Sequence, residues 1–166
     1  MLIRAEQERD RDAIAEVTAR AFAGVEHSDG SEPAIVAALR AAGALSVSLV
    51  AVDRDEVIGH LALSPVGIGG EDRGWFGLGP VSVRPDCQGA GVGSALIRRG
   101  LDLLRKQGAA GCVVLGHPAY YRRFGFETDS ALRYEGAPPE YFMRITFGGS
   151  APAGRVEYHP GFGGTS

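Results

Sequence analysis

One short segment constrains this chain more than any other. Residues 88–94 read Gln-Gly-Ala-Gly-Val-Gly-Ser, and they follow an apolar run, residues 81–83, that ends before Pro85. A helical pattern of residues begins immediately, at residues 91–107. The first N–H groups of a helix have no partner within the helix, and the helix dipole adds partial positive charge there. The segment therefore predicts an anion-binding turn between a strand and a helix.

The glycine spacing separates three known kinds of phosphate-binding loop. A nucleoside-triphosphate loop requires a lysine directly after its last glycine, whereas Gly93 is followed by Ser94. A dinucleotide loop requires G-x-G-x-x-G and an acidic residue after the next strand. Gly89, Gly91 and Gly93 give G-x-G-x-G, and the next apolar run, residues 111–115, offers no acidic residue. The segment fits a third pattern, Q/R-x-x-G-x-G/A, in full.

Hydrophobic periodicity places the other elements around this segment. Apolar residues recur at helical spacing in residues 8–22, 31–42 and 91–107, and a short helix is expected at residues 118–124. The expected strands are residues 2–5, 45–52, 56–66, 75–84, 111–115, 126–134 and 141–147, with one more at 155–158. The order β-α-α-β-β-β-α-β-α-β-β predicts a mixed α/β fold with a central meander and one right-handed crossover through the helix after the glycine loop.

Three local features refine this expectation. Ser31 is expected to cap the second helix, with Pro33 in its first turn. Residues 67–74 are expected to form a polar, glycine-rich turn between two strands. Pro80 lies within the following strand, where it cannot donate to a ladder, so a bulge or a local parting of the sheet is expected there.

Composition limits the class of protein. The chain has 166 residues, of which 45% are hydrophobic, and its formal net charge is −3. These values predict a single globular domain over residues 1–166, with a glycine-rich C-terminal segment at 148–166, and argue against nucleic-acid or membrane binding. Cys87 and Cys112 form neither a disulfide framework nor a metal-ligand spacing, so no metal is expected. The absence of a signal peptide or long apolar run predicts a cytoplasmic protein.

The glycine segment resembles the acetyl-CoA-binding motif of the GNAT superfamily of N-acetyltransferases. Residues 78–85 resemble the family's fourth strand, which parts from its neighbour, and Pro80 fits a strand with an incomplete ladder. Residues 121–126 resemble the family's Y-x-x-x-G-F signature, with Tyr121 four residues before Gly125. The resemblance covers at least residues 1–147. It implies a GNAT-like fold with a mixed, mostly antiparallel sheet, splayed between its fourth and fifth strands and flanked by helices.

The resemblance also implies a function: direct transfer of an acetyl group from acetyl-CoA to a primary amine, without a covalent intermediate. Tyr121 takes the position of the general acid that protonates the CoA thiolate, whereas Tyr120 is expected in the core. The implied partners are acetyl-CoA and an amine acceptor, bound by a monomer or a homodimer. The residues expected to bind acetyl-CoA are Val81, Ser82, Val83, Gln88, Gly89, Ala90, Gly91, Val92, Gly93 and Ser94.

A general base is needed because an amine with a pKa near 10.4 is deprotonated at pH 7 only at a cost of about 4–5 kcal/mol. The candidates are Glu26, which lies beside His27 in the loop between the first two helices, and His60 on a central strand. His117 is interpreted either as a cleft residue or as a helix cap. The same sequence features also fit a second function, a non-catalytic acyl-CoA-binding or regulatory module with the same fold.

Overall fold

The computed structural model describes residues 1–26 and 28–163. Its central sheet has the strand order β1-β2-β3-β4-β5-β7, with β8 paired to β3 and β6 paired to β8. The strands are β1 (Leu2–Ala5), β2 (Val47–Asp53), β3 (Glu56–Ile68), β4 (Glu71–Val83), β5 (Gly111–Leu115), β6 (Leu132–Arg133), β7 (Phe142–Thr146) and β8 (Gly154–Tyr158). The helices are α1 (Arg11–Phe22), α2 (Glu32–Ala41), α3 (Val92–Lys106) and α4 (Pro118–Tyr121).

Within the described part of the chain, five single turns of 3₁₀ helix lie between or after these elements. They are η1 (Glu8–Asp10), η2 (Pro85–Cys87), η3 (Arg122–Phe124), η4 (Pro139–Tyr141) and η5 (Pro160–Phe162). Within the described part of the chain, no helix is both long and apolar enough to cross a membrane.

The sheet splits between β4 and β5. All neighbours along the main strand order are antiparallel except β4 and β5, which pair in parallel over only four residues, ending at Leu78 opposite Val114. Directly beyond, the Gly79–Pro80 peptide is cis, and the β3–β4 register shifts between Leu61 and Leu63. Both the parting of the sheet and the irregularity at Pro80 are therefore confirmed, and β4 is free of β5 from residue 79 onward.

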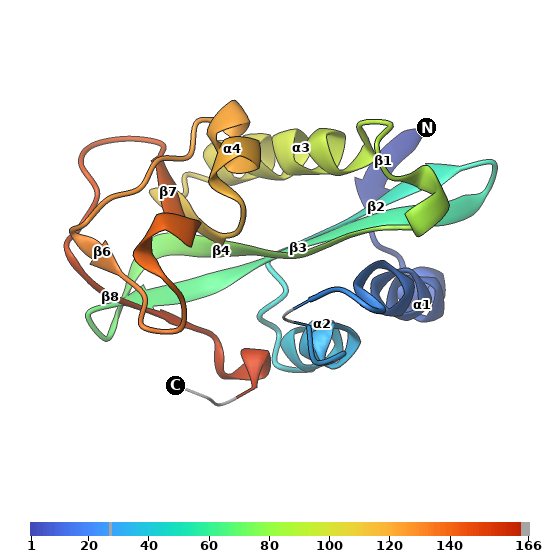
Figure 1. Ribbon diagram of the computed structural model, residues 1–166, viewed down its shortest axis with the longest axis horizontal. Helices are drawn as coiled ribbons and strands as arrows, with labels where there is room; N and C mark the ends of the chain where they lie inside the picture. The colour runs from blue at the N-terminus through green and yellow to red at the C-terminus, as the bar shows by residue number, and fades with distance from the viewer. Residues whose placement is uncertain (27, 164–166) are drawn as a thin grey trace.

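Two layers of helices cover the two faces of the sheet (Figure 1). The upper face in this view carries α3 and α4. The core on this face lies between β3 and α3. Leu61 of β3 lies very close to Gly100 of α3: a Cβ atom added to Gly100 would be 2.5 Å from the Leu61 Cδ2 atom. Leu96 and Leu104 of α3 are fully buried in the same cluster. This close apolar contact fixes α3, and hence the glycine loop at its start, against the sheet.

The opposite face carries α1 and α2 (Figure 1). Ile14 of α1 and Val36 of α2 pack on Val50 of β2. Farther along the sheet, β8 pairs with the end of β3, where Val66 lies opposite Tyr158. The C-terminal part of the described chain thus belongs to the sheet.

Several boundaries differ from the expectation. Residues 67–74 are mostly strand, because β3 and β4 extend to Ile68 and from Glu71 and leave a two-glycine turn. The expected strand at 126–134 is wrong: it is reduced to β6 and one bridge, Glu127 to Arg144. Asp129 accounts for part of this loss, since its carboxylate accepts the N–H of Ala131 and turns the chain locally.

Ser31 does not cap α2 through its side chain, and its own backbone is already helical, with φ −81° and ψ −9°. Its N–H is instead held by the Asp29 carboxylate. His117 occupies the N-cap position of α4, but its side chain makes no capping hydrogen bond. Both corrections have the same cause: the position of a residue before a helix does not determine its rotamer or its φ and ψ.

Candidate functional site

The glycine loop forms the N-terminus of α3. Gly91 is the N-cap residue and has a left-handed backbone, with φ 87° and ψ 8°, a conformation that favours glycine. Gly89 has a φ of 81°. The Gln88 side chain donates a hydrogen bond from Nε2 to the carbonyl oxygen of Val83, at 3.0 Å. Gln88 therefore ties the loop to the end of β4, so the start of α3 and the free part of β4 hold a fixed relative position.

A hollow of about 330 Å³ lies over this loop. Seven of the ten residues expected to bind acetyl-CoA line it: Val83, Gln88, Gly89, Gly91, Val92, Gly93 and Ser94. The other three do not. Ala90 is exposed, Val81 packs against the apolar cluster under α3, and the Ser82 hydroxyl is buried on the opposite face. The N-terminus of α3, where the first N–H groups have no partner within the helix, therefore opens into this hollow.

Three further residues line the hollow: Cys87, Tyr120 and Arg123. The Tyr120 hydroxyl lies 3.4 Å from the Ser94 Oγ atom, so the side chain reaches the loop and is not purely a core residue. The Arg123 guanidinium lies over the Tyr120 ring, 5.3 Å from its centroid. Sequence reasoning missed this pair, although their spacing of three residues, within a short helical segment, places both side chains on one side.

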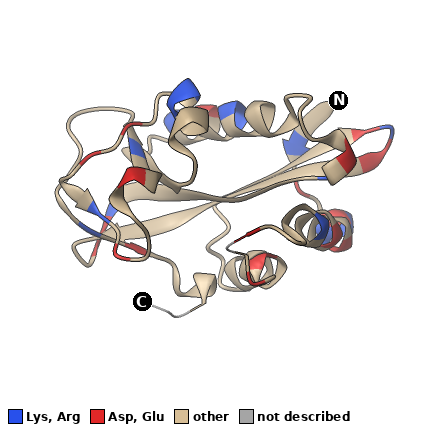
Figure 2. Ribbon diagram, in the orientation of Figure 1, with Lys and Arg blue, Asp and Glu red and all other residues tan. Residues whose placement is uncertain are grey.

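Positive charge accompanies the hollow. Figure 2 shows Lys and Arg residues on α3 and at the turn that follows α4. Arg98 of α3 and Arg123 of η3 both lie over the Phe124 ring, at 5.0 and 5.7 Å from its centroid. These guanidinium groups, together with the helix dipole, give the region the charge that a phosphate requires.

Tyr121 ends α4 and is half buried. Its ring packs edge-on against Tyr120 and Phe126, at centroid distances of 5.1 and 5.8 Å. Gly116 lies against the Tyr121 ring: a Cβ atom added to Gly116 would be 2.3 Å from the Tyr121 Cε2 atom. Burial raises the pKa of Tyr121 to about 12, with a smaller contribution from Tyr120. The phenol therefore stays protonated at neutral pH, in a position fixed by packing.

The two candidate bases lie in different environments. His60 is fully buried on the face that carries α1 and α2, where its Nε2 atom lies 2.8 Å from the Ser48 Oγ atom. Burial lowers the pKa of His60 to about 4, so the imidazole is neutral at physiological pH. Glu26 is exposed between α1 and α2, and it does not line the hollow. His27 lies outside the described residues.

Cys112 does not offer a nucleophile for an acyl-enzyme. Cys112 is fully buried in the cluster under α3, and burial raises the pKa of its thiol well above the usual range. A thiolate is the reactive form of cysteine, so Cys112 remains inert. Among residues 1–26 and 28–163, no group of three or more His, Cys, Asp and Glu side chains is placed to hold a metal ion.

A mixed sheet split between a parallel strand pair, with an anion-binding glycine loop at one end of the split, is the architecture of an acyl-CoA-dependent transferase. Comparison with known families agrees: residues 2–128 match the model of the acetyltransferase (GNAT) domain. A protein of Escherichia coli (strain K12), described as uncharacterized N-acetyltransferase YhbS, is 38% identical over 176 aligned positions that cover 98% of each chain. The chain therefore belongs to the GNAT family of N-acetyltransferases.

Two solved structures resemble the whole chain. A GNAT family acetyltransferase from Brucella melitensis, in complex with acetyl-CoA, is 50% identical and superposes with a TM-score of 0.88 over 97% of each chain. The structure of Escherichia coli YhbS in complex with CoA is 36% identical and gives a TM-score of 0.89, covering 97% of this chain and 91% of that one. The expected GNAT fold is thereby confirmed.

Proposed function

We propose that this N-acetyltransferase moves an acetyl group from acetyl-CoA directly to a primary amine of a small molecule, peptide or protein. The observation that carries the proposal is the hollow over the N-terminus of α3. The hydrogen bond from Gln88 to Val83 joins the glycine loop beneath this hollow to the free end of β4. The similar proteins from Brucella melitensis and Escherichia coli, described in complex with acetyl-CoA and with CoA, support the same cofactor here.

In this proposal the cofactor spans the loop and the split. The pyrophosphate binds the N–H groups at the start of α3, over residues 88–94, where the helix dipole favours an anion. Arg123 and the Tyr120 hydroxyl complete this part of the site. The pantetheine arm runs along residues 81–83, whose backbone has lost β5 as a neighbour. Both ends of the cofactor are thus held by backbone, and the thioester comes to rest in the split.

The protein contributes position and charge to the transfer. Holding the thioester beside the amine converts a bimolecular step into an effectively intramolecular one. A backbone N–H of the free part of β4 stabilises the negative oxygen that develops when the amine attacks the carbonyl carbon. As the C–S bond breaks, the thiolate requires a proton, and Tyr121 supplies the nearby O–H group.

The raised pKa of Tyr121 defines how it acts. With its pKa at about 12 in the free protein, full transfer of its proton to an alkyl thiolate, whose pKa is near 8.5, is unfavourable. The phenol therefore acts first as a hydrogen-bond donor that stabilises the developing thiolate. Tyr121 is the general acid of the proposal, and its advantage is that it remains protonated at every pH at which amines are reactive.

His60 fits the role of base better than Glu26. It is held at a fixed place on β3, directly opposite Ser82 of β4, whereas Glu26 lies in an exposed segment. His60 is also neutral at physiological pH, so it has a lone pair available for a proton.

Binding and turnover test the proposal separately. We expect acetyl-CoA, but not NAD or ATP, to raise the melting temperature of the protein, because a ligand that binds only the folded state stabilises it. A screen of primary amines, followed by release of the free CoA thiol, then measures transfer. Tight binding of acetyl-CoA without turnover on any amine would contradict an enzyme and favour the non-catalytic binding module.

A loop variant tests the site itself. Gly93→Val adds a side chain whose Cβ approaches the Tyr120 hydroxyl at 3.3 Å and enters the hollow. We expect it to raise the Kd for acetyl-CoA at least about tenfold, equivalent to about 1.4 kcal/mol. Gly67→Val is the matched control, because a Cβ there makes only an ordinary contact, 3.7 Å from Glu71, on the β3–β4 hairpin. Equal affinity in the two variants would contradict the assigned site.

A further inference from the structure

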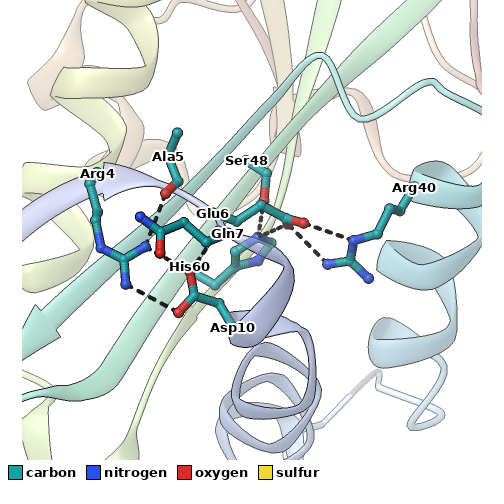
Figure 3. A network of polar contacts seen from close by, with 8 residues as sticks. All are labelled: Arg4, Ala5, Glu6, Gln7, Asp10, Arg40, Ser48 and His60. Carbon is teal, nitrogen blue, oxygen red and sulfur yellow. Dashed lines mark hydrogen bonds and ion pairs between the residues drawn. The ribbon is translucent and has the colours of Figure 1, made fainter.

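A chain of polar side chains crosses the face of the sheet under α1 and α2 (Figure 3). It starts at Arg40 of α2, which donates two hydrogen bonds of 2.9 Å to the Glu6 carboxylate. Glu6 follows β1 and accepts a short hydrogen bond from the Ser48 hydroxyl of β2. Ser48 Oγ in turn lies 2.8 Å from Nε2 of His60 on β3. The chain thus links α2 to the centre of the sheet.

The charge of Glu6 fixes the direction of these hydrogen bonds. Burial alone would raise the pKa of Glu6, but the hydrogen bonds from Arg40 and Ser48 outweigh it and hold the pKa below its usual range. An ionised carboxylate only accepts hydrogen bonds, so Ser48 must donate its single proton to Glu6. The Ser48 oxygen then accepts from His60, which requires the proton of the neutral imidazole to be on Nε2. Nδ1 of His60 is left with a free lone pair.

Nδ1 of His60 is buried and has no hydrogen-bond partner among the described residues. Ser82 of β4 is the cross-strand neighbour of His60, and its hydroxyl is likewise buried and without a partner. Cβ atoms of directly opposed residues lie about 4.5–5.5 Å apart on the same face, so rotation of the Ser82 side chain brings its O–H toward Nδ1. Native proteins seldom leave such groups unpaired, which points to a ligand or a shared proton.

Ser82 places the end of this chain beside the split in the sheet. The last residue of β4 that pairs with β5 is Leu78, so Ser82 lies on the part of β4 that has left β5. The helix α1 packs on both β3 and β4, and the hydroxyl of its Thr18 is also buried and without a partner in the described structure. The groups presented here are neutral: two hydroxyls and an uncharged imidazole. A neutral lining suits a neutral amine, because burial of an unpaired ammonium is costly.

We propose that Ser82 and His60, oriented by Ser48, Glu6 and Arg40, form a buried proton relay beside the split, and that this relay serves an acceptor that arrives as a neutral amine. The proposal rests on the N-acetyltransferase function proposed above. As the amine nitrogen bonds to the thioester carbon, it loses a proton to the Ser82 oxygen, while the Ser82 hydroxyl proton passes to Nδ1 of His60. The C–S bond breaks, and the departing thiolate accepts a hydrogen bond from Tyr121, which keeps its proton. The imidazolium faces Glu6 through Ser48, with Nε2 4.0 Å from the carboxylate, and releases its proton when the product leaves.

The weak basicity of His60 narrows the acceptor class. An imidazole with a pKa of about 4, set by burial and by the opposed charges of Glu6 and Arg40, cannot strip a proton from a free alkylammonium. It can accept a proton from a nitrogen that has already attacked. At pH 7.5 about a third of peptide α-amino groups are neutral, against roughly one in 800 lysine ε-amino groups. The relay therefore favours amines of low pKa, such as an α-amino group.

The first test measures which ring nitrogen of His60 carries the proton, and it does not depend on enzymatic activity. The ¹⁵N NMR signals of His60 distinguish a protonated from an unprotonated ring nitrogen. We expect the proton on Nε2 in the intact protein, and a mixture of tautomers in Ser48→Ala, where the acceptor of that proton is lost. Asp10→Asn is the matched control, because Asp10 pairs with Arg4 at 2.7 Å and accepts the N–H of Gln7 (Figure 3), and no hydrogen bond among the described residues joins it to the polar chain itself. A proton on Nδ1 in the intact protein would overturn the relay.

The second test uses turnover of two peptides of one sequence containing a single lysine. One peptide carries a free α-amino group and a blocked lysine, and the other has the reverse arrangement. We expect the first to react about two orders of magnitude faster at pH 7.5, in line with its neutral fraction. Glu6→Gln and Ser82→Ala should each lower kcat at least about tenfold, with the Kd for acetyl-CoA unchanged, whereas Asp10→Asn should retain the kcat of the intact protein.

The outcomes separate the relay from the function on which it rests. If the intact protein acetylates either peptide and both variants match its kcat, the relay is wrong and the acetyltransferase function stands. Equal rates on the two peptides would also overturn the preference for a neutral amine. If the protein acetylates no amine at all, the proposed function falls, and the relay falls with it. A melting temperature for each variant, compared with that of Asp10→Asn, shows whether a lost rate reflects lost folding.

Discussion

The two faces of the sheet are covered by helices in the same way but differ in chemistry. The face under α3 is closed by apolar contacts, and Leu61, Leu96 and Leu104 are fully buried there. Among the described residues, five buried side-chain polar atoms lack a hydrogen-bond partner, and helix α1 or the strand register assigns all five residues to the opposite face, which α1 and α2 cover. They belong to Thr18, His60, Ser64, Ser82 and Tyr158.

This difference teaches how one sheet can serve two tasks. The apolar face holds α3 rigidly, so the glycine loop and Tyr121 are positioned by packing. The polar face gives up stability, because unpaired buried polar groups are unfavourable, and retains groups that can exchange a proton. The packing that stabilises the fold and the groups that can exchange a proton thus lie on different faces of one sheet. Variants on the apolar face should mainly lose stability, and variants on the polar face should mainly change activity or pH dependence.

The largest effect is expected for Tyr121→Phe. Removal of the phenol hydroxyl should lower kcat about 100-fold or more, because the departing thiolate loses its hydrogen-bond donor. The Kd for acetyl-CoA should change little, since the ring and its packing remain. Tyr141→Phe is the matched control, because Tyr141 is 42% exposed in η4. A Tyr121→Phe enzyme with an unchanged kcat across the pH range would remove this residue from the reaction.

The next largest effect concerns the pH dependence of stability on the polar face. The pKa of His60 is lowered from 6.5 to about 4 by burial. Between these values the unfolded chain binds a proton that the folded protein does not, so stability falls as the pH drops from 6.5 to 4, by about 3 kcal/mol in total. Urea unfolding at several pH values should show this slope in the intact protein and a smaller one in His60→Gln. Equal slopes would contradict a buried, neutral His60.

On the apolar face, Gly100→Ala should destabilise the protein. Its Cβ would lie 2.5 Å from the Leu61 Cδ2 atom in a closely packed core. Overpacking of this kind costs about 1–3 kcal/mol, which outweighs the gain of about 1 kcal/mol from alanine in a helix. The double variant Gly100→Ala/Leu61→Val should recover part of the loss, because the two positions share the contact. Additive effects in thermal unfolding would show that the helix and strand are not in tight contact.

The smallest effect is expected for Ser64→Ala on the polar face. The Ser64 hydroxyl is buried without a partner, so its removal leaves no donor or acceptor unpaired. The free energy of unfolding should stay the same or rise by up to about 1 kcal/mol. Calorimetry can measure this change. A loss of more than about 1 kcal/mol would mean that the hydroxyl is paired in solution, and the contrast between the faces would then be weaker.

The sequence predicts the frame of this fold well because its main signals are local. The glycine loop, the helix after it and the strand with Pro80 are each encoded within a few residues. The strand at 126–134 was wrong in part because the Asp129 carboxylate accepts the backbone N–H of Ala131, a rotamer choice that periodicity does not record. Tyr120 was assigned to the core because its apolar ring is visible in the sequence, while the place of its hydroxyl is not.

The candidate bases show the limit most clearly. His60 could be named from its strand position, but its partners Glu6, Ser48 and Arg40 come from three other elements, up to 54 residues away along the chain. Only the folded sheet brings them together. Conversely, Ser82 was expected to bind the cofactor, and the structure turns its hydroxyl to the opposite face. A pattern along the chain predicts which face a strand residue occupies only when the register is known.

The position of β8 has a consequence for biosynthesis. Residues 154–158 pair with the end of β3, about ninety residues earlier in the chain, and Tyr158 lies against Gly77 of β4. The ribosome delivers this strand after every other strand of the sheet. Val66 and Ile68 belong to a buried cluster with Trp75 and Val113, and β8 adds Val156 to it last. The late position of β8 in the chain therefore makes its pairing with β3 the last strand pairing that synthesis allows among the described strands.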